Sequence, residues 1–165
     1  MFIKRTFLAA VLTTISAFVV SVAAEPMIIG NRDGKDIVTV RGVETTQSKQ
    51  ALPIFPGISG KTSGATGLSL MKVVIPPGGS AEPHVHKRYE SAIYLIQGRV
   101  KTRYGERLKK SVVNTAGDFV FIPANVPHQP VNLSETEPAI AIVARNDADE
   151  QEHVVPYIIE DPPKE

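Results

Sequence analysis

From residue 25 onward, the chain consists of short runs of β-branched and apolar residues separated by Gly, Pro, Asn and Asp. Helical periodicity is almost absent from this part of the chain. The 13 prolines fall mainly between the apolar runs, where a missing backbone N–H donor does no harm. Many short strands bounded by turn residues are typical of a sandwich or a barrel. The sequence therefore predicts an all-β fold.

The pattern predicts nine strands and three irregular segments. The expected strands are 27–29, 37–40, 67–75, 91–97, 99–104, 119–122, 130–133, 139–144 and 154–159. Residues 44–66 mix Thr, Ser, Gly and Pro, and we interpret them as a long surface loop or lid. Residues 145–152 are polar and are expected to form a loop. The predicted organisation is 25–66 as N-terminal strands and irregular loop, 67–160 as the barrel, and 161–165 as a flexible tail.

The first 24 residues have the features of a secretory signal peptide. Lys4 and Arg5 form a basic start, residues 7–20 are mostly apolar, and small residues lead up to Ala24. The apolar stretch is shorter than the roughly 18 residues that suggest a membrane span. We expect cleavage after Ala24 and a periplasmic or secreted mature protein. The alternative is an uncleaved N-terminal membrane anchor.

Charge and cysteine content exclude several function classes. Removing the predicted signal takes away two basic residues and leaves 16 basic and 17 acidic ones, a formal charge of −1. A near-neutral chain without basic blocks gives no reason to expect nucleic acid or, after signal cleavage, a membrane as partner. The chain has no cysteine, which excludes disulfides, thiolate ligands and iron–sulfur clusters. Any metal must therefore bind to nitrogen and oxygen ligands.

Three of the four histidines fall in two short segments. His84 and His86 are two residues apart, so in a strand their side chains point to the same face and can enter a barrel together. Glu90 follows a short turn and can supply an anionic oxygen. Tyr94 shares the face of Glu90 if the next strand is regular. Taken singly, these histidines would be expected at the surface near turns.

The second segment contains His128. The predicted strand 119–122 runs into a turn at Pro123-Ala-Asn125, and Asn tolerates the positive φ that this turn needs better than most residues. His128 follows directly and can be carried back over the barrel. The remaining histidine, His153, matches neither segment and is expected to be exposed.

Together these segments resemble the two conserved motifs of the cupin superfamily, and the sequence of residues 94–152 resembles that of single-domain bacterial cupins. The first motif is matched by Gly78, His84, His86, Glu90 and Gly98, with seven residues before the last glycine in place of six. The second motif is matched by Gly117, Pro123, His128 and Asn132, with Asn125 in place of a glycine.

The resemblance implies a double-stranded β-helix, the jelly-roll cupin barrel, with one divalent metal ion held by His84, His86, Glu90 and His128. Nitrogen and oxygen ligands admit manganese, iron, zinc, nickel or copper and do not choose among them. By analogy with cupins that pair through their sheets, a homodimer is expected.

The leading hypothesis is a metal-dependent enzyme acting on a small polar molecule, as an oxidoreductase such as a dioxygenase, an isomerase or a lyase. Glu90 and Tyr94 are candidate catalytic residues, although Tyr94 also suits a core position. Gln129 and Arg145 are candidates for the substrate pocket, although Arg145 also suits the start of a solvated loop. The first alternative is a non-catalytic cupin that binds or senses a small molecule or the metal. The second alternative is a purely structural metal.

Overall fold

The computed structural model describes residues 26–41, 45–149, 151 and 153–159. The predicted signal peptide and the predicted tail 161–165 lie outside the described residues. No helix in the described part of the chain is long and apolar enough to cross a bilayer.

Six strands form the first sheet, which is antiparallel throughout and has the order β10-β7-β12-β5-β4-β3. In this order its strands are β10 (Phe119–Ile122), β7 (Ser91–Gln97), β12 (Ala139–Arg145), β5 (Ser69–Ile75), β4 (Pro53–Ile58) and β3 (Thr46–Gln47). Strands β5, β7 and β12 have seven residues each and pair along their whole lengths, with one register shift beside Ile140.

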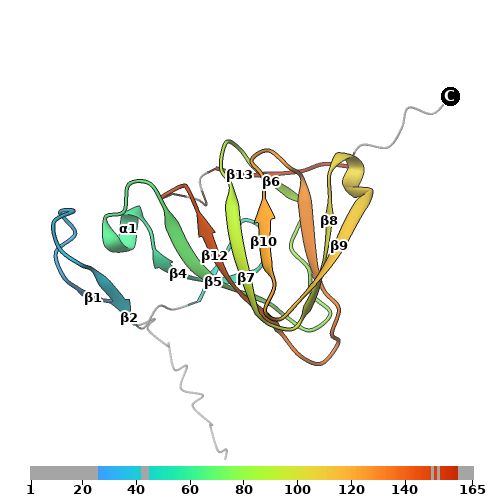
Figure 1. The fold of residues 1–165 in the computed structure, drawn as a ribbon, viewed down its shortest axis with the longest axis horizontal. Coiled ribbons are helices and arrows are strands. Elements are labelled where there is room, and N and C mark those ends of the chain that lie inside the picture. Colours follow the sequence, from blue (N-terminus) through green and yellow to red (C-terminus); the bar gives the residue numbers. More distant parts are fainter. Residues whose placement is uncertain (1–25, 42–44, 150, 152, 160–165) are drawn as a thin grey trace, which may run out of the picture.

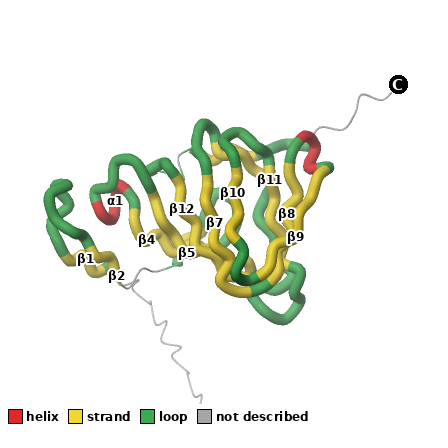
Figure 2. The backbone as a smooth tube through the Cα atoms, viewed as in Figure 1, coloured by secondary structure: helices red, strands yellow, loops and turns green. Residues whose placement is uncertain are grey.

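Five strands form the second antiparallel sheet, in the order β13-β6-β11-β8-β9. They are β13 (Val154–Pro156), β6 (His84–His86), β11 (His128–Asn132), β8 (Arg99–Tyr104) and β9 (Lys110–Thr115). The two sheets curl toward each other and together make the barrel (Figure 1). The tube view shows that strands and loops make up most of the part of the chain that the structure describes (Figure 2).

The remaining elements lie at the rim or outside the barrel. A separate hairpin of β1 (Met27–Ile29) and β2 (Thr39–Arg41) stands beside the barrel at one end of the molecule (Figure 1). The single α-helix among the described residues, α1 (Gly60–Ser63), is one turn long, and its Ser59 cap accepts a hydrogen bond from the Thr62 backbone N–H. A 3₁₀ turn, η1 (Glu106–Leu108), connects β8 to β9.

Alternation along the strands decides what fills the barrel. In β7, Ser91 and Leu95 are buried, whereas Tyr94 and Ile96 on the other face are exposed. In β12, Val143 and Arg145 are both buried, with less buried residues between them. The inward side chains of the first sheet pack in two clusters, one around Leu95 and Ile75 and one around Met71 and Val143. The interior is thus largely apolar, with polar groups concentrated toward one end.

The predicted all-β jelly roll is confirmed. The strands expected at 27–29, 91–97, 99–104 and 119–122 have the observed bounds. The segment 44–66, expected to be irregular, instead contains β4, which pairs with β5 through Ile54 and Val73. The barrel therefore starts before residue 67. Strand β9 was not expected, because most of its side chains are exposed and its polar ends obscure the alternating pattern.

Candidate metal centre

Two strands of the second sheet bring three histidines together. His84 and His86 are the two ends of β6, and His128 begins β11. The strands pair so that His128 lies directly opposite His84. All three side chains are buried, with 3–5 % of their surface exposed. The alternation predicted for His84 and His86 and the convergence with His128 are therefore observed.

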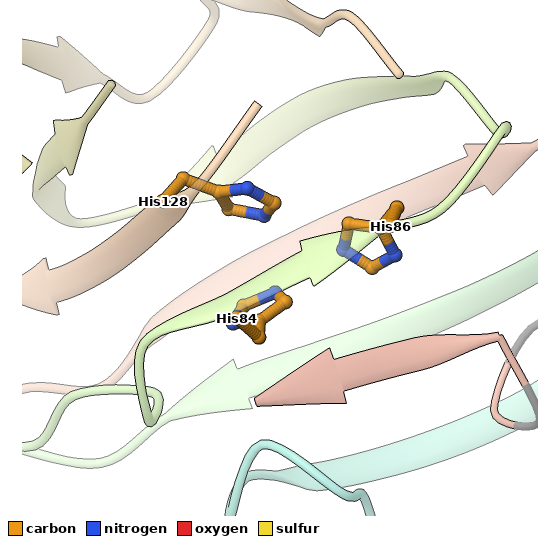
Figure 3. Close-up of side chains that lie close together, drawn as sticks. All are labelled: His84, His86 and His128. Atoms are coloured by element: carbon orange, nitrogen blue, oxygen red, sulfur yellow. The ribbon is translucent and has the colours of Figure 1, made fainter. Parts of the chain in front are cut away.

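The three imidazoles point toward a common centre (Figure 3). One ring nitrogen of each histidine can be chosen so that all three lie within 4.8 Å of one another. The ring centroids are 4.2 Å apart for His84 and His128 and 5.0 Å apart for His86 and His128. Among the described residues, this is the one group of at least three potential ligands from His, Asp and Glu that is close enough to hold a metal ion.

Backbone carbonyls orient two of the rings. His84 Nδ1 lies 2.7 Å from the carbonyl oxygen of Glu82, and His128 Nδ1 lies 2.8 Å from that of Val126. Because a carbonyl oxygen only accepts, each Nδ1 carries the proton, and the lone pair of Nε2 is left for a metal. His86 Nδ1 is buried without a hydrogen-bond partner. These donor groups fit a divalent transition metal ion.

Burial keeps the three imidazoles neutral at physiological pH. Loss of hydration lowers the pKa of His84 to about 3, with a further decrease from neighbouring His128. Burial also lowers the pKa of His128 to about 4, against the opposing effect of its hydrogen bond to Val126. The pKa of His86 is lowered as well, first by burial and then by the positive charge of Arg145. Neutral imidazole is the form that binds metal ions.

A cavity of about 110 Å³ inside the barrel adjoins the histidines. Its lining includes Arg145 and Ser91 together with apolar side chains from both sheets. Arg145 Nε donates a 3.0 Å hydrogen bond to Ser91 Oγ, and both residues are buried. Arg145 thus lies in the pocket, as one of its two sequence interpretations proposed, and ends β12 instead of opening a solvated loop.

Glu90 does not lie with the histidines in this structure. Its side chain is exposed, and it is outside the group of converging ligand atoms. Its backbone N–H donates to Asn146 Oδ1 at 2.8 Å. The neighbouring Ser91 takes the buried, inward position at the start of β7. The ligand role of Glu90 stays a prediction that this geometry does not support.

Tyr94 and Gln129 also lie outside the cavity lining. Tyr94 faces outward because it alternates with inward-facing residues of β7, and its ring packs against Phe119 at a centroid distance of 4.8 Å. This placement corrects the expected inward orientation of Tyr94. Gln129 follows inward-facing His128 and donates to the carbonyl oxygen of Ala81 at 3.1 Å. His153 is partly exposed, as expected, and bonds to Asp147.

Ser91 is a residue of the cavity lining that the sequence did not single out. Its signal was the seven-residue spacing between Glu90 and Gly98, because the usual six intervening residues place Ser91 at the position of the motif's glutamate. The sequence did not indicate Ser91 as part of the site, because serine is not a strong metal ligand.

The second motif performs the structural role expected of it. Asn125 has φ of 63°, as predicted for the turn before His128. Its backbone N–H donates to the carbonyl oxygen of His86, and its side chain accepts from the N–H of Arg88. Buried Asn132 donates from Nδ2 to the carbonyl oxygens of Ile75, Pro76 and Glu137. These bonds hold the two histidine-bearing segments against each other and against β5.

Residues 71–145, which carry both motifs and all three histidines, match the family model of the cupin domain. This segment is similar to a cupin domain. The germin-like protein 3-1 of Oryza sativa subsp. japonica is 28% identical to the chain over 105 residues, covering 62% of this chain and 46% of the relative. The chain spans less than half the length of the curated relatives it matches.

Solved structures show the same cupin fold. Oxalate decarboxylase from Lactobacillus farciminis, in a formate complex, matches with a TM-score of 0.58 and 23% identity over 69% of this chain and 33% of its own. A recombinant oxalate oxidase in complex with glycolate matches with a TM-score of 0.55 and 22% identity over 66% of this chain and 56% of its own. At these identities the likeness establishes the fold of the domain.

Proposed function

We propose that the cupin domain binds one divalent transition metal ion through His84, His86 and His128 and acts as a metal-dependent enzyme on a small molecule. The observation that carries this proposal is the convergence of three buried, neutral imidazoles beside a cavity. A bound ion would supply Lewis-acid or redox chemistry at this position. The donor set admits manganese, iron, zinc, nickel or copper.

The reaction class is an oxidoreductase such as a dioxygenase, an isomerase or a lyase. Two structural neighbours are an oxalate decarboxylase with formate and an oxalate oxidase with glycolate, so small carboxylates are the first substrates to test. Both neighbours are longer than this chain, and their sequences are 23% and 22% identical to it over the matched parts. Their reactions are therefore candidates only.

Elemental analysis of the purified protein tests the metal proposal. We expect about one transition metal ion per chain in the wild type and a loss of most of it in His84→Ala and in His128→Ala. The matched control is His153→Ala, which removes a histidine that contacts Asp147 outside the cluster and should keep its metal. A wild type that takes up no stoichiometric metal under any loading condition contradicts the proposal.

A non-catalytic binding or sensing cupin is the second candidate, and one observation favours it. Apart from the histidines and Arg145, the described lining of the cavity contains no ionisable side chain that could act as an acid or a base. Metal-loaded protein should be incubated with a library of small metabolites. Turnover supports the enzyme, whereas saturable thermal stabilisation without turnover supports the binding protein.

We further propose that the protein is exported to the periplasm or secreted, with cleavage after Ala24. The support is the basic start, apolar stretch and small residues of the first 24 residues. N-terminal sequencing of the protein recovered outside the cytoplasm should begin at Glu25. Retention of Met1 in a membrane fraction would favour the uncleaved anchor instead.

A further inference from the structure

The first sheet presents two adjacent rows of aliphatic side chains to the cavity. Each row crosses strands β5, β7 and β12 through residues that pair in register, and all of these side chains line the cavity. The first row consists of Met71, Ile93 and Val143, and the second consists of Val73, Leu95 and Ala141. One wall of the cavity is therefore hydrocarbon over two successive rows of the sheet.

Core packing leaves part of this wall uncovered. Ile93, Val73 and Ala141 alternate with outward-facing neighbours and line the cavity, but each is only partly buried. Apolar surface beside open space loses both the free energy of burial and the contacts with neighbouring atoms. An apolar ligand would supply both.

The ionisable groups of the lining lie outside these two rows. Arg145 and Ser91 occupy the next row of the sheet and are hydrogen-bonded to each other, and the histidines come from β6 and β11 of the second sheet. Thr102 and Asn114 of the second sheet are polar but uncharged. Apart from Arg145 and the histidines, no described strand residue of the lining is ionisable. A charged or many-hydroxyl ligand body beside the aliphatic rows would therefore lose hydration without gaining partners.

We propose that the cavity binds a small molecule with a hydrocarbon body and a single oxygen-containing head, the body against the two aliphatic rows and the head beside the histidines. The inference rests on the proposed metal site for the position of the head, and it narrows the substrate class to one less polar than the sequence suggested. By the measure in which one water needs about 10–15 Å³, the cavity volume of about 110 Å³ has room for about eight non-hydrogen atoms.

Calorimetric titration of metal-loaded wild-type protein with simple alcohols tests the class. From 1-propanol to 1-heptanol, which fills the cavity, we expect affinity to rise about fourfold per added methylene and then to level off. Erythritol has as many non-hydrogen atoms as 1-heptanol and the same primary hydroxyl, but its body carries further hydroxyls. It should bind at least about tenfold more weakly. Hexanoate and succinate repeat the comparison with a carboxylate head, so the result tests the body whatever the charge of the head.

Variants test the position of the body with the same readout. Ala141→Leu fills part of the cavity from the second aliphatic row, so affinity should level off about three methylenes earlier than in the wild type. The matched control is Ala92→Leu, the same change on the exposed outer face of β7, which should leave the limit at 1-heptanol. Val73→Thr keeps the shape of the side chain and adds a hydroxyl, and it should weaken 1-heptanol binding at least about threefold. Circular dichroism establishes that each variant is folded, and Val73→Thr serves if Ala141→Leu is not.

Elemental analysis of the titrated samples separates the two proposals. Metal-replete protein that binds erythritol as tightly as 1-heptanol, and succinate as tightly as hexanoate, overturns the apolar ligand class and leaves the metal site standing. Protein that takes up no metal but binds 1-heptanol with the expected dependence on chain length overturns the metal proposal and leaves the apolar cavity standing. The same limit of chain length in folded Ala141→Leu as in Ala92→Leu, or unchanged 1-heptanol affinity in Val73→Thr, overturns the placement of the body.

Discussion

The chain itself orients two of the three histidines. His84 and His128 each contact a carbonyl oxygen two residues earlier in sequence, at Glu82 and Val126. This local bond holds the ring in place and selects the tautomer whose Nε2 can bind a metal. His86 lacks a partner for its buried Nδ1, so its ring depends on its surroundings in the pocket for orientation.

At the residue scale, Glu90→Gln distinguishes the sequence motif from the observed geometry. Because the Glu90 side chain is exposed and outside the histidine cluster, we expect the variant to keep its metal stoichiometry and a metal dissociation constant within about twofold of wild type. Competition with a metal-chelating dye measures this constant. A loss of tenfold or more would return Glu90 to the ligand set.

At the scale of the elements, Gly98 forms the tight connection between β7 and β8. It has φ of 91°, and a Cβ there would lie 2.9 Å from both Cα and Cβ of Ala139. We expect Gly98→Ala to lower the free energy of unfolding by about 1–3 kcal/mol, measured by urea denaturation. In Gly67→Ala the new Cβ meets nothing within 4 Å, so this control should change stability little. Equal free energies of unfolding for Gly98→Ala and Gly67→Ala would contradict the close approach of residue 98 to Ala139.

The sequence did not predict strand β4 because its composition is unusual for a strand. Strand β4 contains Pro53, Pro56 and Gly57, which argue against a strand when neighbours are unknown. It tolerates them because its far side pairs only with the two-residue strand β3 and its pairing with β5 shifts register after Pro56. Tertiary packing of Ile54 in the core overrides the local preference.

At the scale of the whole molecule, buried histidines predict loss of stability in acid. Unfolding restores an ordinary pKa of about 6.5 to histidines whose folded pKa is about 3 for His84 and about 4 for His128. Below pH 6.5 the unfolded chain therefore binds protons that the folded chain does not, and stability falls as pH decreases toward 4. Above pH 6.5 these groups contribute no pH dependence.

The measurement is urea denaturation of metal-free protein between pH 8 and pH 4.5. Each buried histidine should lower the free energy of unfolding by up to about 1.4 kcal/mol per pH unit below 6.5. His84→Ala in the metal-free state should show a shallower decrease than wild type. Identical slopes in the two proteins would contradict the assigned cause.

The predicted homodimer has a candidate surface on the outside of the first sheet. Phe119 and Phe121 of the edge strand β10 are 84% and 62% exposed, and Tyr94 and Ile96 of β7 lie on the same face. Exposed aromatic side chains in a group are typical of a protein interface. We therefore expect two copies to pair through this face.

Light scattering coupled to gel filtration tests this expectation. The double variant Phe119→Asp with Phe121→Asp should be monomeric, because pairing would bury two unpaired charges. The control is Ile37→Asp, which changes an apolar residue that is 94% exposed but lies outside this face. A wild type that stays monomeric at high concentration, or a double variant that stays dimeric, would contradict the predicted interface.

Interactions between residues close in sequence were sufficient to predict several features of this protein. Turn residues between short apolar runs predicted the all-β fold, and the period of two in a strand placed His84 and His86 on one face. The need for a positive φ explained Asn125. These properties depend on neighbours within a few residues.

Only the tertiary structure determines which face of β7 points into the barrel and which residues lie near the histidines there. A one-residue difference in where a strand begins exchanges its two faces, and this placed Ser91 inward in the position expected for Glu90. Pairing of β12 with β7 then brought Arg145 to Ser91 across 54 residues of sequence. Such contacts depend on the register between paired strands. The alternation of residues within one strand does not determine that register.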